Sequence, residues 1–136
     1  MTENVAPEVP CARIHEGDVL EPVQIPVTRE TLVRYAGAST DFNPIHWSDR
    51  AARAAGMDGV IAHGMWTMGA ALGVVVHWVA DPGRVVSQRA RFVRPVLVPD
   101  TDEGTQVIVS GQVTKADDQT ATLSLLSLIH ISEPTR

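Results

Sequence analysis

The sequence has a single cysteine, Cys11, and fewer basic than acidic residues. One cysteine excludes an internal disulfide and a thiolate metal cluster, and it fits a reducing cytoplasm. The 11 Lys and Arg against 16 Asp and Glu give a net charge of −5, which argues against nucleic acid or an anionic membrane as the main partner. Met1 to Pro10 lacks the basic start and apolar run of a signal peptide. We therefore expect a cytoplasmic protein.

Charged residues are also missing from Ala62 to Ala80, a run of nineteen residues. That length is enough to span a bilayer. However, the run contains His63, His77 and three glycines, and no basic cluster flanks it. A helix that is apolar all round is equally the buried centre of a soluble domain. We expect the second arrangement, with no membrane contact and with His77 inside the core.

Capping residues and hydrophobic periodicity predict one α+β domain. Thr28 and Ser48 are N-cap candidates for helices ending near Gly37 and Gly56. The remaining predicted elements are the apolar helix over 62–79 and strands over 23–27, 85–93, 105–115 and 120–125. This order predicts an antiparallel sheet wrapped around a long central apolar helix, preceded by a flexible arm over residues 1–14.

The segment from Asp41 to His46 carries the strongest sign of chemistry. It holds a carboxylate (Asp41), an amide (Asn43) and an imidazole (His46) within six residues. Pro44 fixes its own φ and favours an extended Asn43, so the segment reads as a rigid loop. Rigid loops with Asp and His side chains are frequent sites of acid–base catalysis.

Structural roles are the alternative for each of these residues. Asp41 alone would most often form a local Asx turn, and His63 suits a helix start or a supporting position better than catalysis. Met65, Trp66 and Met68 form an apolar helical stripe, which is more often plain core than a binding surface. No His, Cys and Asp spacing matches a metal site, so no metal is expected.

Three motifs together resemble the MaoC-like hydratase/dehydratase family of the hot-dog fold. They are Asp41-Phe42-Asn43-Pro44-Ile45-His46, Ile61-Ala62-His63-Gly64-Met65 and Arg91-Phe92-Val93-Arg94-Pro95-Val96. Within the family, the chain looks most like the (3R)-hydroxyacyl-thioester dehydratases of actinobacterial type-II fatty-acid and mycolic-acid synthesis. The resemblance covers about Ile14 to Leu125, and the domain itself is expected over residues 15–125. Pro99-Asp100-Thr101 departs from the family's usual Pro-Gly-Asp, which affects a turn and not the chemistry.

The resemblance implies reversible dehydration of (3R)-3-hydroxyacyl thioesters to trans-2-enoyl thioesters. His46 would act as general base, Asp41 would act on the same water or hydroxyl, and Asn43 would hold the loop or the water. The backbone N–H of Gly64 would polarise the thioester carbonyl. Residues expected to bind the substrate are His63, Met65, Trp66 and Met68. The substrate would be an acyl-CoA or an acyl-carrier-protein thioester, and no cofactor is needed.

Two other functions stay open at the level of sequence. A hot-dog thioesterase would activate water with a carboxylate at the thioester carbonyl, and it would not need the Asn43-Pro44 and His46 arrangement. A subunit of a heterodimeric dehydratase would contribute only part of the site. Hot-dog domains generally pair through their sheets, so the resemblance implies a homodimer or a heterodimer with a related subunit.

Residues 126–136 do not continue the strand pattern cleanly. The run from Ser127 to Arg136 resembles a translated sequencing-adapter tail. We therefore expect residues 126–136 to be non-native and the domain over 15–125 to lack its final strand. The alternative is a genuine strand from Leu125 to Ser132 with a frayed end.

Overall fold

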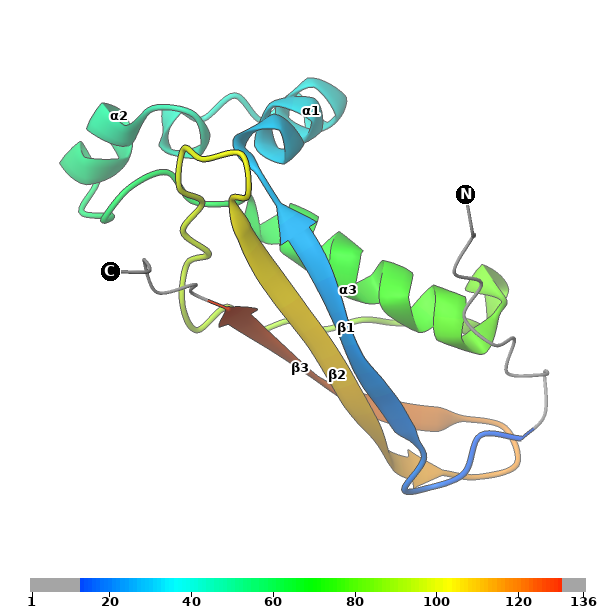
Figure 1. The fold of residues 1–136 in the computed structure, drawn as a ribbon. Helices are drawn as coiled ribbons and strands as arrows, with labels where there is room; N and C mark the ends of the chain where they lie inside the picture. Colours follow the sequence, from blue (N-terminus) through cyan, green and yellow to red (C-terminus); the bar gives the residue numbers. More distant parts are fainter. Residues whose placement is uncertain (1–12, 131–136) are drawn as a thin grey trace, which may run out of the picture.

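A computed structural model describes residues 13–130 of the chain. Most of the expected arm over 1–14, and residues 131–136 of the expected tail, lie outside this range. The elements in chain order are β1 (Val19–Val27), α1 (Arg29–Ser39), the 3-10 helix η1 (Pro44–His46), α2 (Asp49–Ala54), α3 (Gly64–Val79), the 3-10 helix η2 (Pro82–Arg84), β2 (Thr105–Ala116) and β3 (Ala121–His130). They form one α+β unit (Figure 1).

The sheet of the described residues is antiparallel, with the strand order β1-β2-β3. Strand β1 pairs with β2 from Val19 opposite Gln112 to Val27 opposite Thr105. Strands β2 and β3 form a hairpin, in which the Asp117 carboxylate accepts the backbone N–H groups of residues 119 and 120. This confirms the predicted strands over 105–115 and 120–125.

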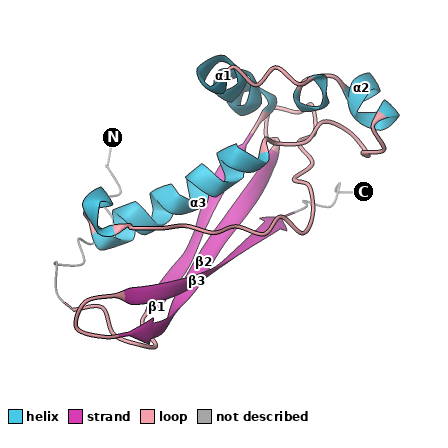
Figure 2. Cartoon of the chain, turned by 180° about the vertical axis from the view of Figure 1, so that it is seen from behind, coloured by secondary structure: helices cyan, strands magenta, loops and turns pink. Residues whose placement is uncertain are grey.

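Helix α3 lies along one face of the sheet (Figures 1 and 2), and the core forms between them. On β2, Val107 and Val109 are fully buried, as expected when alternate side chains face a packed layer. The other buried members of this core cluster are Val27, Leu32, Val60, Ala62, Ala71, Val96 and Val98. The predicted arrangement of an antiparallel sheet and a long apolar helix is therefore confirmed.

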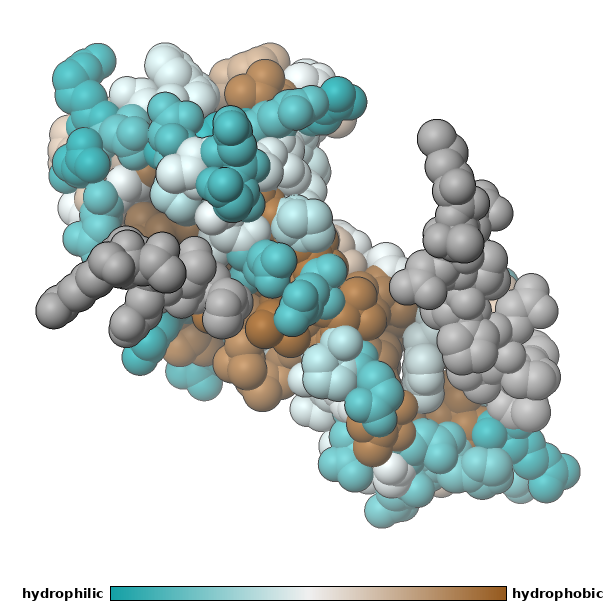
Figure 3. Space-filling view, in the orientation of Figure 1, coloured by the Kyte–Doolittle hydropathy of each residue, from teal (hydrophilic) through white to brown (hydrophobic). Residues whose placement is uncertain are grey.

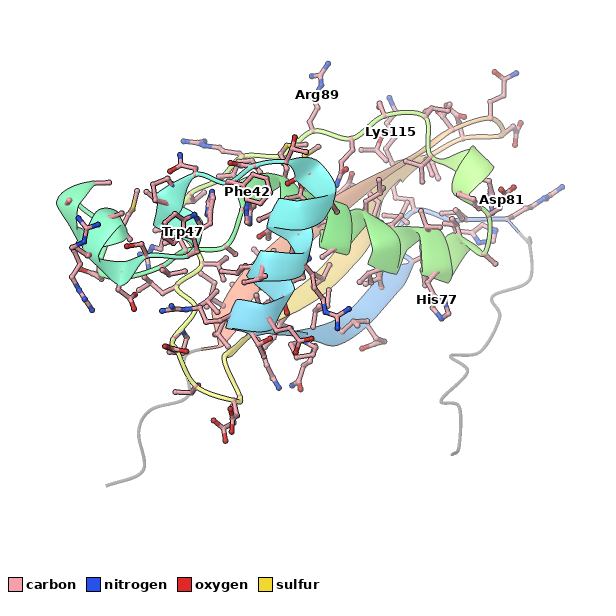
Figure 4. All side chains as sticks on the ribbon, turned by 90° about the horizontal axis from the view of Figure 1, so that it is seen from above. Phe42, Trp47, His77, Asp81, Arg89 and Lys115 are labelled. Atoms are coloured by element: carbon pink, nitrogen blue, oxygen red, sulfur yellow. The ribbon has the colours of Figure 1, made fainter. Side chains whose placement is uncertain are left out.

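The sheet covers only part of the surface of α3. His77 was expected in the core, but it is exposed and points away from the helix (Figure 4). That prediction was wrong because it assumed packing all around the helix, whereas in the described range a three-stranded sheet packs on one side. No helix within residues 13–130 combines the length and the hydrophobicity needed to cross a membrane.

The segment over residues 85–93 is not a strand of the sheet, which corrects the sequence prediction. Its Val86 and Val93 side chains are 89% and 78% exposed, and the segment carries no strand assignment. The Gln88 side chain donates to the carbonyl of Met68 and so ties the segment to α3. The β-branched and aromatic residues of this segment, such as Val86 and Phe92, favour an extended backbone, but a strand also requires a neighbour for its hydrogen bonds.

Strand β3 is longer than predicted and includes residues 126–130 of the expected tail. Its side chains alternate, so that Leu125 and Ile129 pack against the core. Leu126 and Leu128, on the opposite face, are 55% and 52% exposed. In Figure 3, apolar residues gather over the middle of the molecule, where the strands run, and hydrophilic residues dominate both ends.

Candidate active site

The loop after α1 is held by a series of side-chain bonds to its own backbone. Helix α1 ends at Ser39, and Thr40 adopts a left-handed conformation with φ 60°. The Ser39 hydroxyl then accepts the N–H of Asp41 at 3.2 Å. Oδ1 of Asp41 accepts the N–H of Asn43, and Oδ1 of Asn43 accepts the N–H of Ile45, both at 3.2 Å. Asn43 thus caps η1. Asp41 uses Oδ1 for its local turn, and its Oδ2 is left to interact with other groups.

His46 lies at the end of η1 and is 8% exposed. Its Nδ1 lies 2.7 Å from the carbonyl oxygen of Ile61. Because a carbonyl only accepts, Nδ1 carries the proton and Nε2 of the neutral ring has a free lone pair. Nε2 faces Oδ2 of Asp41 at 3.9 Å. Two acceptors at this separation suit a hydroxyl or water oxygen placed between them, about 2.8 Å from each.

His63 contacts both members of the pair, the ring of His46 and the backbone of Asp41. It is the N-cap of α3 and is 1% exposed. Its ring stacks on His46 with centroids 3.8 Å apart and 23° between planes, and Tyr35 meets it edge-on. Nε2 of His63 donates to the backbone carbonyl of Asp41 at 3.1 Å. Burial lowers the pKa of His63, and the neighbouring His46 lowers it further, so His63 is neutral at physiological pH.

Asp41, His46 and His63 are also a group that could hold a metal, with ligand atoms within 4.8 Å of one another. A metal bound by imidazole lies in the plane of the ring. The two rings are nearly parallel and stacked, so their lone pairs do not converge on one point. The donor set therefore fits proton transfer better than metal binding as it stands.

The N-terminus of α3 supplies backbone donors next to this pair. Gly64 is the first residue of the helix and is exposed, and His63 makes no side-chain capping bond. The first N–H groups of an α-helix have no partner within the helix, and they carry its positive dipole end. A Cβ on Gly64 would lie 3.4 Å from the Phe92 ring. The Phe92 ring therefore lies beside the N-terminus of α3, in ordinary van der Waals range of a Cβ at this position.

The expected substrate-binding residues of α3 are spread over different environments. Met65 is 63% exposed. Trp66 packs against the core cluster, and Met68 is half-buried. The structure thus brings together Asp41 and His46, both expected as catalytic, with His63, whereas Met65, Trp66 and Met68 differ in their exposure.

Two contributors to the site were absent from the sequence predictions. The Ile61 carbonyl sets the tautomer of His46, and the Tyr35 ring packs on His63. A backbone carbonyl leaves no trace in residue identity. Phe42 and Trp47 are likewise linked, because the indole N–H of Trp47 donates to the Phe42 carbonyl (Figure 4). This bond closes the loop around η1.

The geometry and two solved structures define the class of domain. A "MaoC-like dehydratase" shares 32% sequence identity with a TM-score of 0.74, over 85% of this chain and 40% of that one. The ChsH1-ChsH2 complex from Mycobacterium tuberculosis shares the fold at 22% identity, with a TM-score of 0.72 over 86% of this chain and 88% of its match. The chain is therefore an α+β hot-dog domain, as the sequence predicted.

The family follows from the sequence match. Residues 11–127 match the family described as "MaoC like domain", and the chain belongs to this family. The 3-hydroxyacyl-thioester dehydratase X of Mycobacterium tuberculosis is 40% identical over 75 residues, which are 55% of this chain and 26% of the relative. The mitochondrial 3-hydroxyacyl-[acyl-carrier-protein] dehydratase of Arabidopsis thaliana is 33% identical over 101 residues, which are 73% of this chain and 58% of the relative. The chain thus spans less than two thirds of either relative.

Proposed function

We propose that this domain catalyses the reversible dehydration of (3R)-3-hydroxyacyl thioesters to trans-2-enoyl thioesters. One observation carries the proposal: Nε2 of His46 and Oδ2 of Asp41 face each other at 3.9 Å with both lone pairs free. A hydroxyl on C3 of the substrate, or a water, fits between them as a hydrogen-bond donor to either atom. The names of the mycobacterial and plant relatives describe this reaction class.

In the hydration direction, His46 takes one proton from the water as the water oxygen bonds to C3. The electron pair of the C2–C3 double bond moves toward the thioester carbonyl, and the proton held by His46 is then delivered to C2. The carboxylate of Asp41 orients the water and stabilises the imidazolium. The N–H of Gly64 and the positive end of α3 stabilise the charge on the carbonyl oxygen. No step requires a cofactor.

The substrate would be an acyl-CoA or an acyl-carrier-protein thioester, and the working unit a homodimer or a heterodimer with a related hot-dog subunit. The solved ChsH1-ChsH2 complex supports the heteromeric arrangement, because that neighbour is an assembly of two different chains. In either assembly, this chain supplies the catalytic pair of Asp41 and His46, and it also supplies the backbone donor at Gly64.

The experiment is the addition of water to crotonyl-CoA and to a longer trans-2-enoyl-CoA. Loss of enoyl absorbance reports hydration, and a thiol reagent in a parallel sample reports free CoA. We expect loss of enoyl absorbance with formation of a 3-hydroxyacyl-CoA and no thiol release. Thiol release without hydration would contradict the proposal and favour a thioesterase.

A further inference from the structure

The bond that sets the tautomer of His46 ends on a carbonyl within a tightly held segment. Ile61 belongs to residues 60–62, which connect α2 to α3. Backbone hydrogen bonds join this segment to Ile45 on one side and to residues 96–98 on the other. The position of the Ile61 carbonyl, and with it the orientation of the His46 ring, depends on how this segment is held.

One backbone donor of the segment is bound by a side chain. The N–H of Val60 donates to Oδ1 of Asp49 at 3.0 Å. Asp49 is the first residue of α2, and both of its carboxylate oxygens also accept hydrogen bonds from Nη2 of Arg29, at 3.0 and 3.1 Å. Arg29 is fixed in turn by donating Nε to the carbonyl of Val98 at 2.7 Å. The Val60 N–H and then the Arg29 guanidinium lower the pKa of Asp49.

The hydrogen bonds between Arg29, Asp49 and Val60 are partly shielded from solvent and closely packed. The side chains of Arg29 and Asp49 are only 21% and 35% exposed. A Cβ on Gly59 would lie 3.2 Å from Oδ1 of Asp49, so the absence of a side chain there permits the close approach. Asp49 and Arg29 together thereby connect α1 and α2 to the backbone at Val60, the residue before Ile61, and at Val98.

We propose that Asp49, held by Arg29, is a positioning residue for His46. It acts through the bonds from Asp49 to Val60, along the backbone to the Ile61 carbonyl, and from that carbonyl to Nδ1 of His46. The role in catalysis rests on the proposed dehydratase function, whereas the effect on the His46 tautomer does not. Displacing the Ile61 carbonyl weakens the bond to Nδ1 and lets the neutral ring place its proton on Nε2, which removes the base.

Three variants separate this role from general stability. Asp49→Glu keeps a carboxylate for Arg29, but the longer side chain moves that carboxylate beyond hydrogen-bonding distance of the N–H of Val60. The cavity of about 490 Å³ that Arg29 and Asp49 help to line leaves room for the added methylene. Asp49→Asn keeps an oxygen acceptor for Val60. The control is Glu30→Gln, which breaks the exposed ion pair between Glu30 and Arg34 on α1, the helix that also carries Arg29.

The measurement is the protonation pattern of the His46 ring by nitrogen–proton NMR correlation at mildly alkaline pH, together with kcat and KM for enoyl-CoA hydration. Wild type, Asp49→Asn and Glu30→Gln should show the Nδ1–H tautomer. Asp49→Glu should show a mixture, with kcat lowered about 10- to 100-fold and KM nearly unchanged.

A folded Asp49→Glu with an unchanged His46 tautomer would overturn the inference. So would a rise in KM with unchanged kcat. If the wild type hydrates no enoyl thioester, the proposed function fails, but the tautomer comparison still decides the role of Asp49.

Discussion

The rings of His46 and His63 stack with their centroids 3.8 Å apart, so a positive charge on one directly opposes a charge on the other. Burial lowers the pKa of His63, so the His63 ring stays neutral. The two stacked rings therefore do not both carry a positive charge. A proton taken up by His46 then meets the Asp41 carboxylate on one side and a neutral ring on the other. This asymmetry supports the proposal that His46 exchanges the proton and that His63 positions it.

A first prediction concerns the pH dependence of stability. The folded-state pKa of His63 lies below its ordinary value of 6.5 because of burial, so below that value the unfolded chain binds the proton more readily. The free energy of unfolding should therefore fall as the pH drops from about 7.5 to about 5.5. Chemical denaturation across this range measures it.

The matched comparison for this prediction uses two substitutions. His63→Phe should flatten the pH dependence below about pH 6.5, whereas His77→Asn, at an exposed position of α3, serves as the control and should keep the wild-type slope. A slope in His63→Phe equal to that of the wild type would assign the acid sensitivity to another group.

A second prediction concerns the cap of η1. Asn43→Ala removes the acceptor for the N–H of Ile45 and should lower the free energy of unfolding by about 1 kcal/mol. It should also lower kcat, because the loop carries both Asp41 and His46. Asn43→Asp keeps the acceptor and should retain the stability in urea titrations at neutral pH. Equal losses of stability in both variants would mean that the cap is not the cause.

A third prediction tests the backbone contact at Gly104. This residue has φ +60°, and a Cβ there would lie 2.0 Å from the carbonyl oxygen of Val27. Gly104→Ala should therefore cost at least about 2 kcal/mol of stability. Gly37→Ala, inside α1 with open space around it, should instead stabilise by up to about 1 kcal/mol. Thermal unfolding of the pair checks this, and an unaffected Gly104→Ala would disprove the contact.

A fourth prediction concerns the expected tail. Leu126 and Leu128 are exposed on the face of β3 away from the core, and β3 is the last strand of the sheet over residues 13–130. If residues 126–136 are non-native, replacing both leucines by lysine should reduce nonspecific aggregation and leave both the defined dimer and the activity intact. Analytical ultracentrifugation and the hydration assay provide the two readouts. Loss of activity together with loss of a defined dimer would instead make this face a working interface.

The sequence predicted the parts of the fold that local signals determine. Thr28 and Ser48 both act as N-caps of their helices, and the strand after residue 105 alternates as expected. The strand over residues 85–93 was wrong because its pattern is local but pairing requires a neighbour. His77 was wrong because apolar composition alone does not tell how many sides of a helix are covered.

The candidate site divides in the same way. Asp41, Asn43 and His46 lie close together in sequence, so a rigid loop was enough to predict their proximity. The partners that orient them were beyond sequence reasoning. Ile61 acts through its backbone carbonyl, and Asp49 reaches Val60 across eleven residues. Such contacts exist only once the helices and the sheet have packed.

The central claim is that Asp41 and His46 act as one unit on a water or hydroxyl between them. The most direct measurement compares the rate of crotonyl-CoA hydration by wild type, Asp41→Asn, His46→Ala and the double variant, with folding checked by circular dichroism. The account predicts that each single variant loses about 100-fold or more in kcat and that the double variant loses little beyond that, since the two groups share one proton transfer. Folded single variants that keep the wild-type rate would contradict it.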